Sequence, residues 1–205
     1  MSAAIGFALV SLLFAGVNDV VFKRYSRQER SRGMFVLGIG IVWGILQLLA
    51  LVMQGQQLDV ATPALAFGIA AGAMVTLSNL RAGFGVTFKA GLSQGAHAPT
   101  MMLIAAASWI IGGFCYARFR EHRVRITRKK LGYSALSGVL VFVIVNSLAL
   151  ALERGQASIV VPIANLSFIV ALALSVAMKM ERLTMRKTIA TVCAAVSIYL
   201  LAQLS

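Results

Sequence analysis

The sequence predicts an all-α, polytopic bundle of transmembrane helices with about seven spans. Of its 205 residues, 60% are hydrophobic and only 12% are charged, whereas a soluble domain is usually about 45–50% apolar and about 25% charged. Seven stretches lack Asp, Glu, Lys and Arg, and each is long enough for a helix to cross the ~30 Å hydrocarbon core of a bilayer. These stretches are 1–18, 33–58, 60–80, 98–117, 131–152, 155–178 and 188–205. The composition therefore predicts the lipid bilayer as the surroundings of the chain, and it excludes secreted, disordered, soluble-enzyme and nucleic-acid-binding proteins.

The positive charge of the chain is confined to three short segments between the apolar stretches. The net charge is +13, and segments 23–32, 118–130 and 179–187 carry all of it because the charged residues elsewhere cancel. Lys and Arg beside transmembrane helices are enriched on the cytoplasmic side. We therefore expect the three segments to face the cytoplasm and its anionic lipid headgroups. The alternative, binding of an acidic partner, lacks a groove-reading motif or interleaved aromatic residues.

Short connections and small residues indicate a compact bundle. Residues 55–59 join the second and third stretches, and residues 153–155 join the fifth and sixth, so these neighbouring helices are expected to be antiparallel. Two Gly-x-x-x-Gly patterns, Gly40 with Gly44 and Gly68 with Gly72, suit close approach between membrane helices. The two cysteines lie inside apolar stretches without metal-ligand spacing, so we expect neither a disulfide framework nor a metal site.

The region 60–97 creates an inconsistency in the topology. If it crosses the membrane once, the basic segments 23–32 and 118–130 face opposite sides, although both carry the cytoplasmic signal. The region is too long for one span and too short for two full spans with a turn. Either one basic segment is translocated, or this region does not cross once. A re-entrant segment is a further alternative, provided that no irregular backbone faces lipid.

An internal repeat predicts two related halves. Phe22-Lys23 is followed by Trp43, and Phe88-Lys89 is followed at the same distance by Trp109, with an offset of 66 residues between the two sets. Further residues match at this offset: Gln28 with Gln94, Leu37 with Leu103, and Gly72 with Gly138. Similarity between halves is typical of transporters built by duplication. We assign 1–80 to a partial first repeat of about three spans, and 81–205 to a second repeat of about four spans plus a partial one.

The second half of the chain resembles a known family. The stretch ALERGQASIVVP (151–162) leads into an apolar span, MERLT follows at 180–184, and YLL at 199–201 closes the last span. This order resembles the second half of an EamA-like domain of the drug/metabolite transporter superfamily, over 98–205 and more loosely over 1–80. The resemblance implies ten helices in two inverted five-helix repeats around a central pathway. It also implies that this chain is an internally shortened member, with about three spans absent near 79–81.

The candidate pathway residues are polar or aromatic side chains within the predicted spans. Asp19, next to Asn18, is a candidate proton or cation site because a carboxylate at membrane depth is usually functional. Its alternative is an interfacial pair with Lys23 at i, i+4. Three Asn residues could hydrogen-bond a solute or, alternatively, a neighbouring helix. These are Asn79, Asn146 and Asn165.

Proline and tryptophan complete the candidates. Pro162 removes one backbone hydrogen bond near the start of its helix, which either frees a carbonyl to line a cavity or only kinks the helix. Trp43 and Trp109 fall near mid-span, where they either stack on an aromatic or cationic ligand or fill the bundle core. Glu181, among basic residues, is interpreted as a structural ion-pair partner.

The sequence favours transport over catalysis. It contains no nucleophile elbow, zinc-helix motif, phosphate-binding loop or paired membrane aspartates, so we expect neither enzyme activity nor a cofactor. We predict export of small metabolites or drug-like solutes by alternating access, driven by an ion gradient or passive, in a bacterial inner membrane. The alternative is a non-transporting membrane protein, either a remnant or a packing subunit. Whether two copies assemble one pathway is left open.

Overall fold

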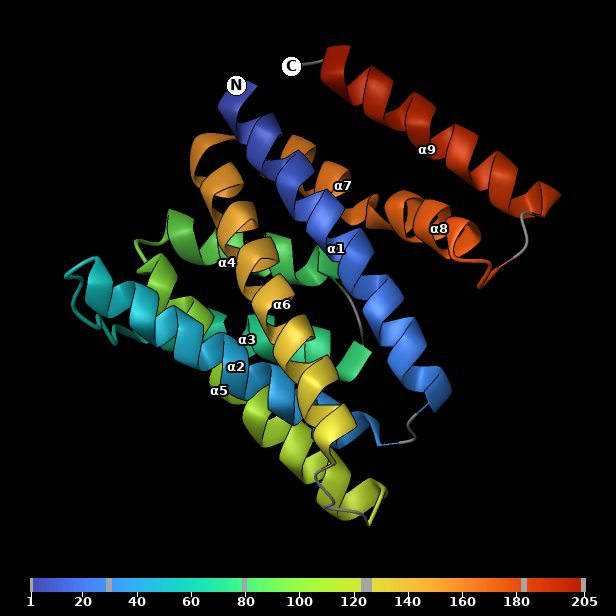
Figure 1. The fold of residues 1–205 in the computed structure, drawn as a ribbon. Helices are drawn as coiled ribbons and strands as arrows, with labels where there is room; N and C mark the ends of the chain where they lie inside the picture. The colour runs from blue at the N-terminus through green and yellow to red at the C-terminus, as the bar shows by residue number, and fades with distance from the viewer. Residues whose placement is uncertain (1, 29–30, 79–80, 123–126, 182–183, 204–205) are drawn as a thin grey trace.

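The computed structural model describes residues 2–28, 31–78, 81–122, 127–181 and 184–203, and every regular element among them is helical (Figure 1). The elements in chain order are α1 (Ser2–Gln28), α2 (Arg32–Met53), α3 (Thr62–Ser78), α4 (Arg81–Ser93), α5 (Ala98–Cys115), the π-helical turn η1 (Tyr116–Arg120), α6 (Arg128–Arg154), α7 (Ala157–Asn165), α8 (Ser167–Ala177) and α9 (Met185–Gln203). The predicted all-α polytopic bundle is confirmed.

Five helical segments among the described residues are long and apolar enough to cross a membrane. They are Ala3–Arg27, Arg32–Met53, Ala98–Arg120, Arg128–Arg154 and Ala157–Ala177, the last of which combines α7 and α8. Large apolar side chains such as Leu13, Ile45 and Ile111 are more than half exposed on the outside of the bundle. Such a surface is expected where the surroundings are lipid, because exposed apolar side chains cost nothing there. The predicted stretches 60–80 and 188–205 fall on α3 and α9, outside these five segments.

The region 60–97 folds as a hairpin of two short helices. Gly91 of α4 packs so closely on Phe67 of α3 that a Cβ atom at residue 91 would lie 3.0 Å from the Phe67 Cβ. Along the sequence, Phe67 precedes the end of α3 by about as many residues as Gly91 follows the start of α4. Their contact therefore makes the two helices antiparallel. With 17 and 13 residues, both helices are shorter than the roughly 20 residues of a full span. The region therefore passes into the bundle and back, which favours the alternative in which 60–97 does not cross once.

The three basic segments consequently meet at one end of the bundle, which we call the basic end. The carboxylate of Glu121 accepts hydrogen bonds from Ser31 Oγ (2.7 Å) and from the backbone N–H of Arg32 (2.7 Å). The ammonium of Lys23 forms an ion pair with Glu181. These contacts join segment 23–32 to both of the other basic segments. All three basic segments can therefore lie on the cytoplasmic side, where Lys and Arg beside transmembrane helices are enriched.

The sequence repeat is also a repeat of contacts. Gly72 of α3 packs on Ser108 of α5, and Gly138 of α6 packs on Val42 of α2. The offset of 66 relates Gly72 to Gly138 and Val42 to Ser108. Two further pairs of contacts are related by the same offset. The contact of Gly68 with Ile104 corresponds to the contact of Ser134 with Gly38. The contact of Phe67 with Gly91 corresponds to the contact of Tyr133 with Tyr25. The relation therefore pairs α1–α3 with α4–α6.

The two related halves are inverted with respect to each other. Lys23 follows Phe22 at the basic end of α1, where it pairs with Glu181. Lys89 follows Phe88 at the opposite end of the bundle, where its ammonium donates to the backbone carbonyls of Leu152 and Gly155 (3.3 Å for Gly155). Equivalent residues thus lie at opposite ends, as expected for an inverted-topology repeat.

Candidate functional site: a central cavity

A cavity of about 450 Å³ lies between the helices of the two related halves. Its wall is formed by α1 and α2 from the first half, by α4, α5 and α6 from the second, and by α7. Most of the wall is apolar, and its polar side chains among the described residues are Ser11, Asn18, Asp19 and Asn165. An apolar pocket with a few convergent polar groups is the usual architecture of a small-molecule site.

The helix α1 supplies the polar side of the cavity. Ser11, Ala15, Asn18 and Phe22 follow one another at the spacing of a single helix face, and all four line the cavity. Ser11 Oγ donates to the backbone carbonyl of Ile144 (3.1 Å). Ser137 Oγ of α6 donates to Asn18 Oδ1. These bonds attach α1 to α6 and hold its polar face toward the cavity.

Asp19 lies at the boundary of two hollows. It lines the central cavity and also a second hollow of about 310 Å³ between α1, α8 and α9. Ser167 Oγ, in the first turn of α8, donates to Asp19 Oδ2 at 3.5 Å. Lys23, the partner considered for Asp19 in the sequence, lines the second hollow together with Asp19 and forms an ion pair with Glu181. The carboxylate of Asp19 therefore stands between the cavity and the basic end.

The two tryptophans meet across the inverted repeat. Trp43 of α2 and Trp109 of α5 have ring centroids 5.7 Å apart at an interplanar angle of 77°, an edge-to-face arrangement. Both line the cavity, and Trp43 is 1% exposed. The indole Nε1 of Trp43 is buried without a hydrogen-bond partner among the described residues. The pair thus fills the bundle core and forms part of the cavity wall.

The break between α7 and α8 brings Asn165 to the cavity. Pro162 lies inside α7 and has no backbone N–H, so the helix is weakened one turn before it ends at Asn165. The amide nitrogen of Asn165 donates to the backbone carbonyl of Val161 (2.8 Å). Asn165, Ala164 and Val161 line the cavity, whereas Pro162 lies outside the lining. The proline acts on the site through the backbone beside it.

Two other sequence candidates stand apart from the cavity. Asn146 lies outside the lining, and its amide nitrogen donates to Gln47 Oε1 of α2 (3.0 Å) and to the carbonyl of Phe142 (2.8 Å). This is the interhelical bond that the sequence analysis gave as the alternative role. Asn79 falls outside the described residues.

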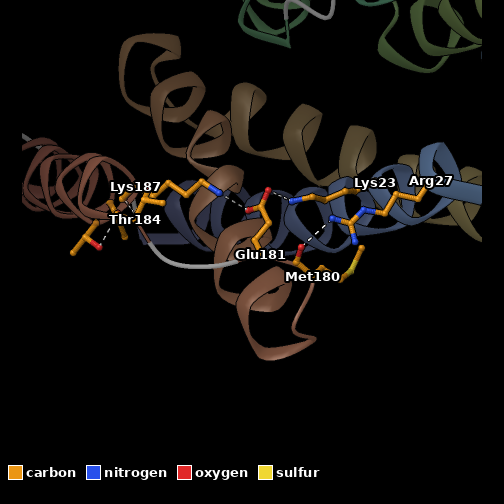
Figure 2. A network of polar contacts seen from close by, with 8 residues as sticks. Lys23, Arg27, Met180, Glu181, Thr184 and Lys187 are labelled. Atoms are coloured by element: carbon orange, nitrogen blue, oxygen red, sulfur yellow. Dashed lines mark hydrogen bonds and ion pairs between the residues drawn. The ribbon is translucent and has the colours of Figure 1, made fainter.

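A polar network joins α1, the α8–α9 connection and α9 at the basic end (Figure 2). Glu181, in the connection between α8 and α9, pairs with Lys23 of α1 and with Lys187 of α9 (3.1 Å). The guanidinium of Arg27 donates to the carbonyl of Met180 (2.9 Å). The ammonium of Lys23, followed by that of Lys187, lowers the pKa of Glu181 below its ordinary value. The predicted ion-pair role of Glu181 is confirmed.

Sequence reasoning missed several residues of the cavity wall. Ser11, Phe22 and Phe84 were not among the pathway candidates, and all three line the cavity. For Ser11 and Phe22 a signal existed, because residues 11, 15, 18 and 22 share one helix face with Asn18. Phe84 carries no comparable signal, since its position depends on the α3–α4 hairpin. Among the described residues, no cluster of His, Cys, Asp or Glu could hold a metal ion.

The comparison with known families decides the affiliation of the chain. Residues 73–203, from within α3 to the end of α9, match the EamA-like transporter family, and they make up more than half of the sequence. The chain belongs to the EamA-like transporter family. No curated protein and no solved structure matches it.

Membership in the EamA-like family agrees with the fold and the site. The resemblance drawn from residues 151–201 is confirmed, and with the five apolar helical segments it makes the chain a multi-pass membrane protein. The family consists of transporters of the drug/metabolite type rather than enzymes. The central cavity is therefore the candidate solute site of an EamA-like protein.

Proposed function

We propose that this EamA-like protein exports small, largely apolar solutes through the central cavity by alternating access. One observation carries the proposal: a cavity of about 450 Å³, with polar groups from α1 and α7, lies between two inverted repeats. A solute that crosses ~30 Å of hydrocarbon needs polar partners that lipid cannot offer. Ser11, Asn18, Asp19 and Asn165 provide such partners inside the bundle.

The inverted repeat supplies a basis for alternation between two openings. In such proteins one repeat rocks against the other around a fixed site. At the basic end, the Lys23–Glu181–Lys187 network joins α1 to the α8–α9 connection and to α9. At the opposite end, Lys89 joins α4 to the end of α6. These two sets of contacts are the candidates to open in turn, with the basic end facing the cytoplasm of a bacterial cell.

The proposal is tested by counterflow into proteoliposomes loaded with one of three phenyl solutes. Benzyltrimethylammonium, phenylalanine and benzenesulfonate share an aromatic ring and differ in charge, and each crosses pure lipid slowly. We expect the wild-type protein to exchange at least one of them. Asn165→Leu replaces an amide of the cavity wall, so it is expected to abolish this exchange while expression and thermal stability stay at the wild-type level.

Asn146→Leu is the matched control, because it makes the same replacement at an amide outside the lining. It removes the bond to Gln47 and is therefore expected to lower the unfolding temperature while exchange per folded molecule is retained. Exchange that survives Asn165→Leu would refute the assignment of the cavity. Absence of exchange for all three solutes would favour the non-transporting alternative, a remnant or packing subunit.

A further inference from the structure

The wall of the central cavity contains a buried hydrogen-bond donor without a partner. The side chain of Trp43 on α2 is 1% exposed, and its indole Nε1 has no hydrogen-bond acceptor among the described residues. An indole N–H can only donate. The large majority of buried polar side-chain atoms in proteins do have a partner, because a buried donor left unsatisfied costs free energy. This donor therefore marks a place where an acceptor from outside the chain would be stabilising.

The neighbouring ring of Trp109 does not replace such an acceptor. Trp43 and Trp109 meet edge to face, with ring centroids 5.7 Å apart. An N–H group directed at an aromatic face makes only a weak bond, second to one with a carbonyl oxygen. Both tryptophans line the cavity. An oxygen of a molecule bound in the cavity is therefore the stronger partner for the indole N–H of Trp43.

Asn18 of α1 adds a second donor to the same wall. It lines the cavity, and its side chain is 3% exposed. Its Oδ1 accepts a hydrogen bond from Ser137 Oγ of α6, which orients the amide. No bond from the amide nitrogen of Asn18 leads to another described residue. The N–H groups of this amide are therefore left for a molecule in the cavity.

The inverted repeat gives the cavity wall two chemically different halves. At the offset of 66, Asn18 and Trp43 correspond to Phe84 and Trp109, and all four residues line the cavity. The position of the Asn18 amide on α1 is thus occupied by an aromatic ring on α4. A solute that fits both halves has an apolar body and one polar end, and the polar end is complementary to donors.

We propose that the cavity binds a solute with an apolar, preferably aromatic, body and a carbonyl-type oxygen, and that Trp43 and Asn18 supply the donors for this oxygen. This inference rests on the function proposed above and adds the chemical class of the solute. On binding, the indole N–H of Trp43 gains a partner that the described part of the chain does not provide. A site built to bond a polar group rejects an analogue that lacks this group, because the buried donor then stays unpaired.

Two probes of the same shape isolate the contribution of the oxygen. Acetophenone and α-methylstyrene share the ring and the branched substituent, and a carbonyl oxygen in the first replaces a methylene carbon in the second. The chain contains two tryptophans. In a neutral detergent, protein with isotope-labelled indole nitrogens therefore shows two indole N–H resonances, which Trp109→Phe assigns. We expect acetophenone to move the Trp43 proton saturably downfield, relative to α-methylstyrene at the same concentration in the micelle.

Trp43→Phe keeps an aromatic ring at this position and removes the N–H. The measured quantity is the ratio of the affinities for acetophenone and α-methylstyrene, read from the Trp109 resonance, because the ratio cancels any effect of the smaller ring on packing. From the usual net value of a hydrogen bond, this ratio is expected to fall about two- to tenfold. Tyr116→Phe is the matched control, since it removes one donor from an exposed aromatic side chain outside the lining. Its ratio is expected to equal that of the wild type.

The amide is tested in the same way. Asn18→Leu removes the second donor, so the affinity ratio is expected to fall in this variant as well. Asn146→Leu makes the same replacement outside the lining, and its ratio is expected to stay at the wild-type value.

Three results would overturn the proposal of an oxygen-bearing solute, and none depends on the folding of a donor variant. The first is equal affinity of the wild-type protein for the two probes. The second is a Trp43 resonance that moves no further downfield with acetophenone than with α-methylstyrene. The third is exchange of benzyltrimethylammonium alone in the proteoliposome assay, because this solute has no oxygen; transport itself would then stand. Selective binding of acetophenone without exchange of any solute would instead support the site and contradict transport.

Discussion

Gly113 shows how single residues set the spacing of this bundle. It lies where α5 crosses α2, and a Cβ atom at this position would lie 2.5 Å from the backbone nitrogen of Leu37 and 2.9 Å from the carbonyl oxygen of Gly33. Backbone atoms cannot move aside as a flexible side chain can, so any substitution separates the two helices. The α2–α5 crossing also places Trp43 beside Trp109, so this spacing shapes the cavity.

Gly113→Ala is therefore expected to destabilise the protein by about 1–3 kcal/mol, the usual cost of overpacking. The measurement is the thermal unfolding midpoint of the purified protein in detergent. Gly132→Ala is the control, because no atom lies within 4 Å of the added Cβ and alanine favours the helix. A Gly113→Ala protein as stable as Gly132→Ala would show that the helices do not cross this closely.

The asparagines mark the limit of what the sequence predicts at the residue scale. Asn146 and Asn165 are the same residue type in two apolar spans, and sequence analysis left both with the same two alternatives, a pathway contact or a bond to a neighbouring helix. Their surroundings differ, because Asn146 bonds to Gln47 of the neighbouring α2, whereas Asn165 lines the cavity at the end of α7. Which side of a helix meets a cavity depends on helix rotation, and a uniformly apolar span carries little signal of that rotation.

At the scale of elements, α2 is anchored by a carboxylate from a distant part of the chain. Glu121 accepts from Ser31 Oγ and from the backbone N–H groups of Arg32 (2.7 Å) and Gly33 (3.2 Å), the first residues of α2. A negative charge at a helix N-terminus satisfies free N–H groups and interacts favourably with the helix dipole. Sequence analysis treated Glu121 only as part of a basic segment, because this partner lies far away in the chain.

Glu121→Gln is expected to lower the stability by about 0.5–2 kcal/mol, the usual value of a capping interaction. The amide keeps one acceptor oxygen but loses the charge that favours the helix N-terminus. Thermal unfolding in detergent measures the change, with the exposed Glu153→Gln as the control of equal charge. If both variants unfold at the same temperature, Glu121 does not anchor α2.

The closure of the basic end has a defined pH dependence. The pKa of Glu181 is lowered by Lys23 and Lys187, so the carboxylate binds a proton less readily in the folded protein than in the unfolded chain. Its stabilising effect is therefore complete above the unfolded pKa, near 4.5, and disappears as the pH falls through the lower folded value. The difference in unfolding midpoint between wild type and Glu181→Gln is expected to stay constant from pH 7 to about 5 and to shrink below that. A difference that already shrinks between pH 7 and 6 would implicate another group.

At the scale of the whole molecule, the sequence predicted the class and the family better than the path of the chain. Composition and uncharged stretches identify a membrane bundle because lipid imposes both. Residues match at an offset of 66 in the sequence because equivalent positions make equivalent contacts in the fold, as Gly72 and Gly138 do. The sequence left the path of 60–97 open between alternatives, because neither α3 nor α4 has the length of a full span, and span length is the quantity that hydropathy measures.

The hairpin makes a topological prediction that separates this fold from a single crossing of 60–97. Reporter domains fused after residues 28, 95 and 122 would lie after α1, after α4 and after η1. The fold places residues 28 and 122 at the basic end, because Glu121 contacts Ser31, and residue 95 at the opposite end, because nearby Lys89 contacts Gly155. We expect the fusions at 28 and 122 to be cytoplasmic and the fusion at 95 to be on the other side. A single crossing would instead put 28 and 122 on opposite sides, so one pair of fusions distinguishes the two folds, whatever solute the protein carries.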